Sequence, residues 1–280
     1  MLKKIRSLTY QYAIPAAFIV YILIDLLLHG ISQLLSLLPQ TLPIKYLSHS
    51  ILIIIPVALV FFFGFSSAFK KGNLWRGLIC CLPFIVSQLF ALLIFFSKNL
   101  GNPEANWKPL HLIIYGVFTI VGIGVREECI YRAITQNIIA KKHANSVKGV
   151  WITAIVGASI FGLMHISNVF VDVNPISVLS QVISAAFVGL LFSAVYLRSG
   201  SLWALILIHT LTDLTSLTKS TFLDNTLTQE LNQISWDWSK LILWLVYIGL
   251  TAFLLRPSKC KQIYESLCFA GEESEAATHT

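Results

Sequence analysis

Charged side chains are scarce in this chain. Asp, Glu, Lys and Arg together make up 12% of the 280 residues, whereas hydrophobic residues make up 56%. A soluble domain carries about 25% charged residues, so this composition excludes an ordinary soluble protein. Together with a mean hydropathy of +0.76, it indicates an integral membrane protein.

Cysteine lacks the spacings that give it a structural role. The five cysteines are Cys80, Cys81, Cys129, Cys260 and Cys268. They form no Cys-x-x-Cys pair, so they indicate neither a zinc knuckle nor a disulfide framework. Because several of them fall in or near apolar segments, we interpret them as unpaired packing residues.

Three signatures of membrane proteases are also missing. The sequence has no His-Glu-x-x-His of an intramembrane metalloprotease. It has no Gly-x-Gly-Asp of an aspartyl protease and no Gly-x-Ser-Gly of a rhomboid-type serine protease. The string nearest to the serine motif, residues 157–160, reads Gly-Ala-Ser-Ile. The usual motifs of these three protease classes are therefore excluded.

Acidic residues are the rarer charged kind. Thirteen Asp and Glu stand against 20 Lys and Arg, which gives a net charge of +7 and a pI of about 9.2. The basic residues lie in loops between apolar segments, where they contact anionic lipid headgroups and set the topology. We therefore expect membrane lipids as partners, and no nucleic acid.

Long apolar runs are abundant. A membrane-spanning helix needs roughly 20 apolar residues to cross about 30 Å of hydrocarbon. Eight segments qualify, at about 13–38, 48–69, 77–97, 110–140, 147–168, 176–197, 201–218 and 238–255. The sequence therefore predicts an all-α, polytopic membrane helix bundle with about eight transmembrane helices. We expect a single transmembrane domain over 1–256, with the motifs in 110–218, and a disordered cytoplasmic tail over 257–280.

Lys and Arg concentrate in alternate loops. The richer loops and ends contain Lys3, Lys4 and Arg6; Lys70, Lys71 and Arg76; Lys141, Lys142 and Lys148; Arg198; and Arg256, Lys259 and Lys261. Since cytoplasmic loops carry the excess of basic residues, this alternation predicts that both termini are cytoplasmic. An odd number of spans would break the alternation at the tail.

The fourth apolar segment needs an argument from length. Residues 111–125 alone would form a helix of only about 22 Å at 1.5 Å per residue, which is too short to span. Extending the helix through Ile139 places Glu127 and Glu128 near its middle. We therefore expect this acidic pair to be immersed in the bundle, with the helix ending around Lys141.

Three short motifs put polar residues inside apolar segments. They are Glu127-Glu128-x-x-x-Arg132, Phe161-x-x-x-His165 and His209-x-x-x-Asp213. Ionisable side chains at membrane depth are costly, and by default they face the bundle interior and mark function. The three motifs together predict a polar reaction centre on neighbouring helices.

Spacing indicates how these side chains pair. Glu128 and Arg132 are four residues apart and share a helix face, which leaves Glu127 free to act as a general base. Asp213 either orients His209 or joins it in stabilising an oxyanion. Each motif also has a structural alternative. This is an ion-pair cluster at a helix end for the first motif, a histidine hydrogen-bonded to a backbone or Ser partner for the second, and a structural pair for the third.

The same residues suggest two ways of activating water. Glu127 and His165 can take its proton directly, or a metal such as zinc can bind it. Zinc accepts His and carboxylate ligands and keeps an open position for water. The ligands of such a metal would be Glu127, His165 and His209, but the sequence predicts no metal firmly.

The order and spacing of the three motifs resemble the CPBP group, also called the Abi family, of CAAX-type prenyl endopeptidases and bacteriocin-processing or immunity proteins. The third block matches over residues 196–213, which read Tyr-Leu-Arg-Ser-Gly-Ser-Leu-Trp-Ala-Leu-Ile-Leu-Ile-His-Thr-Leu-Thr-Asp. The resemblance implies a glutamate-dependent intramembrane endopeptidase with eight helices. It implies that Glu127 and His165 activate water, that His209 and Asp213 stabilise the oxyanion, and that Glu128 and Arg132 support the site.

One position departs from the family pattern. Asp213 stands where Asn is common, and an ionised Asp cannot donate to an oxyanion, whereas Asn can.

Two other functions stay open. One is a non-catalytic immunity or interaction protein that binds a peptide or a sensor partner, and the other is a transporter with a proton relay. We expect the protease to reside in a bacterial plasma membrane and to cut a membrane-associated peptide or protein, such as a bacteriocin leader.

Overall fold

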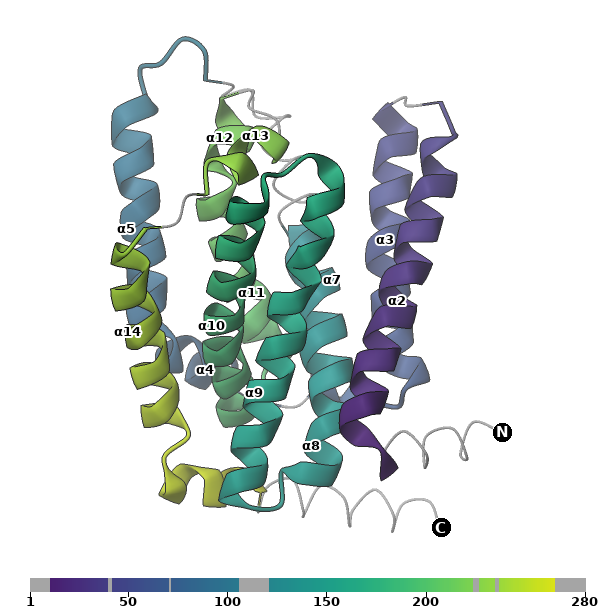
Figure 1. The fold of residues 1–280 in the computed structure, drawn as a ribbon, viewed down its shortest axis with the longest axis vertical. Helices are drawn as coiled ribbons and strands as arrows, with labels where there is room; N and C mark the ends of the chain where they lie inside the picture. The colour runs from purple at the N-terminus through teal and green to yellow at the C-terminus, as the bar shows by residue number, and fades with distance from the viewer. Residues whose placement is uncertain are drawn as a thin grey trace.

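The computed structural model describes residues 11–39, 42–70, 72–105, 121–223, 227–234 and 237–264. Throughout these ranges the chain is helical or in turns, with no β-strand. The longer helices run roughly side by side and form a bundle (Figure 1). The all-α fold that the composition predicts is therefore confirmed.

The helices follow the apolar segments in order. They are α2 (Ala13–Ser36), α3 (Leu42–Phe62), η1 (Ser66–Phe69), α4 (Leu74–Cys80), α5 (Leu82–Asn99), α7 (Gly122–Glu128), η3 (Cys129–Gln136), α8 (Asn137–His143), α9 (Val147–Leu163), η4 (Met164–Val171), α10 (Pro175–Ser199), α11 (Leu202–Ser216), α12 (Thr218–Phe222), α13 (Leu227–Asn232) and α14 (Ser239–Leu254). A final helix covers Pro257–Tyr264.

Fewer spans meet the length criterion than the sequence predicts. Among the described residues, four helices are long and apolar enough to cross a membrane: α2, α5, α10, and α9 continued through η4. Counting α14 with the helix after it, which is bent by 60°, as one span makes five. Two further apolar helices, Leu47–Phe62 and Leu202–Ser216, are shorter. The total of eight spans and the cytoplasmic termini stay predictions.

The predicted third and fourth segments differ from single α-helices. The segment at 77–97 is divided at Cys81 because Pro83 starts a new helix, α5. In the fourth segment, residues 106–120 lie outside the described residues. From Gly122 to His143 the chain is one continuous helical run, as expected, but its middle, η3, is a π-helix.

Local sequence explains how α10 leads into α11. Gly200 ends α10 in the left-handed conformation at φ 65°, which glycine adopts without steric cost. Ser201 then caps α11, since its hydroxyl accepts a hydrogen bond from the backbone N–H of Ala204. This tight turn sets the position of α11, the helix that carries His209 and Asp213.

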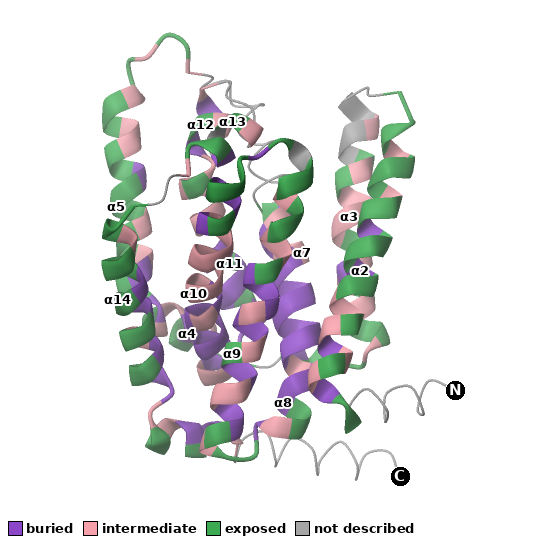
Figure 2. Ribbon diagram, viewed as in Figure 1, coloured by how far each residue is buried: buried purple, intermediate pink, exposed green. Residues whose placement is uncertain are grey.

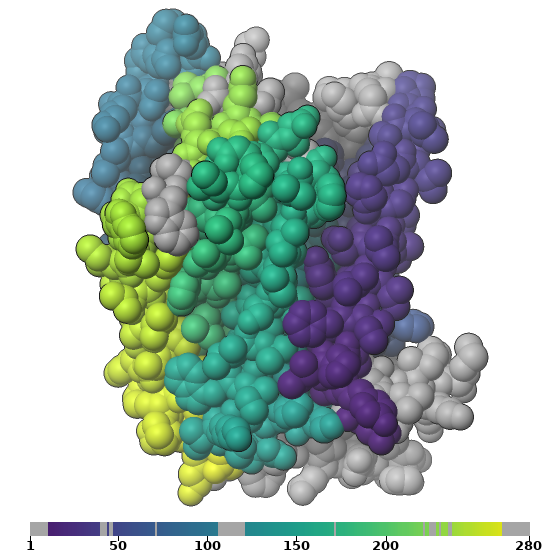
Figure 3. Space-filling model, viewed as in Figure 1, coloured from purple at the N-terminus to yellow at the C-terminus, as the bar shows by residue number. Residues whose placement is uncertain are grey.

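Burial is concentrated in the centre of the bundle. Buried residues gather where η3, α8, α9, α10 and α11 meet, whereas α2, α5 and α14 are mostly exposed (Figure 2). The exposed side chains on these outer helices are largely apolar, for example Leu26, Phe90 and Leu245. Such surfaces suit lipid rather than water. In the space-filling view α2 and α14 flank the inner helices on opposite sides (Figure 3).

The chain after α14 differs from the expected disordered tail. Residues 257–264 form a helix, with Cys260 and Ile263 buried against the core. Burial of these apolar side chains gives the short helix a reason to form, so the expectation of disorder is corrected for this part. Residues 265–280 lie outside the described residues.

Candidate active site

The acidic pair lies at a junction of two helix types. Glu127 and Glu128 are the last two residues of α7, and Arg132 follows in the first turn of the π-helix η3. Glu128 and Arg132 are fully buried, and Glu127 is 7% exposed. π-Helical turns are rare and occur frequently at functional sites, so this junction marks the region as a candidate site.

Glu128 and Arg132 form the ion pair that their spacing predicts. The Glu128 Oε2 atom lies 3.4 Å from Arg132 Nε. The guanidinium carbon lies 4.9 Å from the ring centroid of Phe161 and 5.9 Å from that of Phe192. A charge surrounded by apolar rings loses its hydration, so each member of this pair depends on the other.

His209 is surrounded by three carboxylates. Its Nδ1 atom lies 2.7 Å from Glu128 Oε1. Its Nε2 atom lies 3.5 Å from Glu127 Oε2 and 3.6 Å from Asp213 Oδ1. The sequence paired His209 with Asp213, but its shortest contact is with Glu128. The structure thus brings both motifs into one cluster.

A glycine allows α7 and α11 to approach. A Cβ atom on Gly124 would lie 2.8 Å from Thr210 Oγ1 and 3.3 Å from the Ile206 carbonyl oxygen. Only a residue without a side chain fits there unless its neighbours move. This close approach brings the carboxylates of α7 within reach of His209 on α11.

His165 stands apart from the carboxylate cluster. It is half-buried at the second residue of η4, and its Nδ1 atom lies 3.2 Å from the carbonyl oxygen of Phe161. Its ring centroid is 5.5 Å from that of Phe161. Within the described residues, His165 forms no ion pair with Glu127. Phe161 contacts both histidines, since its ring centroid is also 5.7 Å from that of His209.

Two further residues contact the cluster that the sequence did not single out. Arg126 Nη2 lies 3.5 Å from Glu127 Oε1, and one third of its side chain is exposed. Phe192, on α10, has its ring centroid 5.7 Å from that of His209. The sequence contains a signal for Arg126, because it is a charged residue next to the acidic pair in an apolar segment. Phe192 had none, since it is one of 18 phenylalanines.

The candidate metal ligands are not arranged around one point. In the parts of the chain that the structure describes, no group of three or more His, Cys, Asp or Glu side chains could hold a metal ion. Of the three expected ligands, Glu127 and His209 meet at 3.5 Å, while His165 binds a backbone carbonyl. The geometry therefore gives no reason to route a reaction step through zinc.

The comparison with protein families matches the region that holds these residues. Residues 109–215 match the family model described as Type II CAAX prenyl endopeptidase Rce1-like. No curated protein and no solved structure matches the chain. The matched segment contains all three motifs and the whole candidate site. This match supports the resemblance to the CPBP family of CAAX-type proteases that the three motifs indicate.

Proposed function

We propose that this membrane protein is an intramembrane endopeptidase that hydrolyses a peptide bond of a membrane-associated peptide or protein. The family match supports protease activity. The observation that carries the mechanism is that the two histidines have different hydrogen-bond partners. His165 faces a carbonyl oxygen, whereas His209 faces carboxylates on both sides.

The partner of His165 leaves it a free acceptor. A carbonyl oxygen only accepts hydrogen bonds, so the Nδ1 atom beside Phe161 carries the proton in the neutral ring. Its Nε2 atom then has an unshared lone pair. A ring held in this tautomer can accept a proton from water, which is the role of a general base.

The partners of His209 favour a ring that donates hydrogen bonds from both of its nitrogens. Carboxylates only accept hydrogen bonds, and only the imidazolium form of histidine donates from both nitrogens. Counted with Arg126 and Arg132, an imidazolium gives three positive groups for the three carboxylates of the cluster. A charged donor suits the negative oxygen of a tetrahedral intermediate.

These roles combine into a hydrolysis without a metal. Glu127, assisted by His165, removes a proton from water, and the water oxygen attacks the carbonyl carbon of the substrate. His209 donates to the oxygen that becomes negative, while Glu128 and Arg132 hold His209 in place. The proton then passes to the amide nitrogen as the carbon–nitrogen bond breaks.

The proposed location is the plasma membrane of a bacterium. The proposed substrate is a peptide that meets the site near the membrane surface, such as a bacteriocin leader or a segment of another membrane protein. The polar site lies among helices whose outer faces are apolar, so a substrate held in the same bilayer reaches it without leaving the lipid.

A reconstituted cleavage assay tests the proposal. The protein is placed in liposomes with fluorogenic peptides ending in Cys-aliphatic-aliphatic-X, farnesylated or unmodified, and with membrane-anchored leader peptides. We expect wild-type protein to cut at least one class, and Glu127→Ala and His165→Ala to lose at least about 100-fold in rate. Lys148→Ala, on an exposed surface residue, is the control and keeps the wild-type rate.

Two further outcomes would change the proposal. Loss of cutting on addition of a chelator would assign water activation to a bound metal. If no peptide is cut, and both alanine variants still support the cellular phenotype of the wild type, the chain acts as a binding protein instead.

A further inference from the structure

Two phenylalanine rings lie next to the buried ions. The centroids of Phe161 and Phe192 are each 5.7 Å from that of the His209 ring. The same rings lie 4.9 and 5.9 Å from the guanidinium carbon of Arg132. We propose that Phe161 and Phe192, together called the aromatic clamp, are positioning residues that hold the side chains of Arg132 and His209 in their relative positions.

The guanidinium has little else to fix its position. Within the described residues, none of the three nitrogens of Arg132 makes a hydrogen bond, and its ion pair with Glu128 is long at 3.4 Å. A cation over the face of an aromatic ring is attracted by the ring quadrupole, and more strongly when desolvated. Besides the ion pair with Glu128, the two rings therefore attract the guanidinium and can direct its position.

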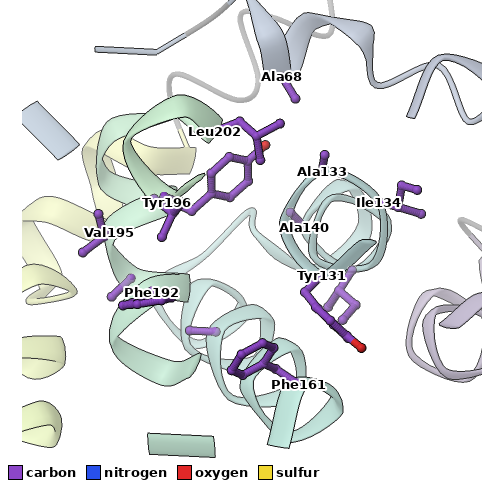
Figure 4. Packing of buried hydrophobic residues seen from close by; sticks show 14 of the residues in the cluster. Ala68, Tyr131, Ala133, Ile134, Ala140, Phe161, Phe192, Val195, Tyr196 and Leu202 are labelled. Atoms are coloured by element: carbon purple, nitrogen blue, oxygen red, sulfur yellow. The ribbon is translucent and has the colours of Figure 1, made fainter. Parts of the chain in front are cut away.

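The clamp is itself held from both sides by other aromatic rings. Tyr131 packs on Phe161 at 5.1 Å, and Tyr21 packs on Tyr131 at 5.8 Å. Phe84 packs on Phe192 at 5.6 Å. Figure 4 shows Tyr131, Phe161 and Phe192 projecting from three neighbouring helices. A shift of either clamp ring would have to move these neighbours.

Packing also leaves Phe161 little freedom. The side chain is 4% exposed and Phe192 is fully buried. A Cβ atom on Gly189 would lie 2.8 Å from Cδ1 of Phe161, so the missing side chain at residue 189 provides the space for this ring. The clamp is thus a fixed wall against which Arg132, and through Glu128 also His209, is placed.

Fluorinated phenylalanine separates this role from simple packing. 3,4,5-Trifluorophenylalanine has nearly the size of phenylalanine, but fluorine withdraws the negative charge from the ring face. It is placed at position 161, at 192, or at 222 as the matched control. Phe222 is also buried and packs against two rings, at 5.4 and 5.8 Å, and it lies on α12, whereas the ions of the site lie on α7, η3 and α11.

The expected result rests on the proposed endopeptidase activity. Substitution at 161 or 192 lowers kcat about tenfold with KM changed less than about twofold, while substitution at 222 changes neither. Phe161→Leu and Phe192→Leu, which lose the ring, lower kcat at least as much. Equal rates for the fluorinated variants at 161, 192 and 222 would overturn the proposal.

A second measurement does not depend on cleavage. In histidine labelled with ¹⁵N, the ring signals of His209, assigned with His209→Gln, report its contact with Glu128. We expect the chemical shifts of these signals to change when the fluorinated residue is at 161 or 192, and to stay unchanged when it is at 222. If the wild type cuts nothing, the proposed function fails while this measurement still decides the clamp. Unmoved signals in both clamp variants would overturn it.

Discussion

At the scale of single residues, two adjacent glutamates have different surroundings. Glu128 is fully buried and contacts both Arg132 and His209. Glu127 lies at the edge of the cluster, between the partly exposed Arg126 and His209. Because a buried ion left without its partner is strongly destabilising, we expect Glu128 to contribute to both stability and the proposed activity, and Glu127 mainly to the activity.

Glutamine at each position distinguishes the two roles. We expect Glu128→Gln to lower the free energy of unfolding by about 3–5 kcal/mol, because the buried Arg132 loses its counter-charge. Glu127→Gln should lower it by less than about 1 kcal/mol, since its contact with Arg126 is partly exposed.

Thermal unfolding in detergent and the cleavage assay make the comparison. Both variants are expected to be inactive in cleavage, but only Glu128→Gln should unfold at a clearly lower temperature. If Glu127→Gln proved the less stable of the two, the division of roles between the glutamates would be wrong.

Asp213 is the position where the chain departs from the family pattern. Its Oδ1 atom lies 3.6 Å from His209 Nε2, and its buried Oδ2 atom has no hydrogen-bond partner within the described residues. Asp213→Asn replaces an acceptor with a group that can donate to the oxyanion, while Glu128 still holds His209. We therefore expect Asp213→Asn to cut at least as fast as the wild type.

The control for this change removes the polar group altogether. Asp213→Leu should cut at least about tenfold more slowly than Asp213→Asn, because it leaves the oxyanion with one donor fewer than Asn provides. A tenfold loss in Asp213→Asn itself would show that the carboxylate is required, either to orient His209 or as a protonated acid.

Sequence reasoning at this scale succeeded where the partners are close in the chain. The Glu128–Arg132 pair follows from a spacing of four residues on one helix. The contact between Glu128 and His209 joins residues 81 positions apart, and no local pattern specifies it. The same limit hid Phe192, which became a site residue only through the packing of α10 against the cluster.

At the scale of elements, the site depends on how closely α7 approaches α11. The contacts of Glu127 and Glu128 with His209 require the space that Gly124 leaves beside Thr210 and Ile206. Adding a side chain there would separate the helices, because the atoms it would meet include the backbone carbonyl of Ile206.

Valine at position 124 tests this dependence. We expect Gly124→Val to lower the free energy of unfolding by about 1–3 kcal/mol through overpacking and to lower the cleavage rate at least tenfold as the contact of Glu128 with His209 lengthens. Gly249→Val is the matched control, because a Cβ there meets nothing within 4 Å. If the two variants behaved alike, close approach of α7 and α11 would not matter.

The boundaries of a helix could be predicted where an apolar segment has clear ends in the sequence. The segment predicted at 176–197 corresponds to α10, Pro175–Ser199, and the one at 238–255 to α14, Ser239–Leu254. The π-helix η3 was not predictable, since nothing in residues 129–136 distinguishes it from an α-helix by spacing. All eight of its residues are buried, so its form is set in a packed environment that local spacing does not describe.

At the scale of the whole molecule, the two ends of the bundle differ in charge. Lys141 and Lys142 lie in the last turn of α8 and Lys148 in the first turn of α9, so all three flank the connection between these helices, at the lower end in Figure 1. The loop after α5, which contains Glu104, lies at the opposite end. Since basic residues mark the cytoplasmic side, this arrangement predicts which end faces the cytoplasm.

Cysteine labelling tests that orientation directly. In a chain whose five native cysteines are replaced by serine, Lys148→Cys and Glu104→Cys each place one thiol at an exposed position on opposite ends of the bundle. An impermeant maleimide added to intact cells should label the thiol at residue 104 and spare the one at 148. Inside-out vesicles should give the reverse pattern, because the bilayer separates the two ends. Labelling of residue 148 from outside would invert the topology, and the site would then meet its substrates from the other face of the membrane.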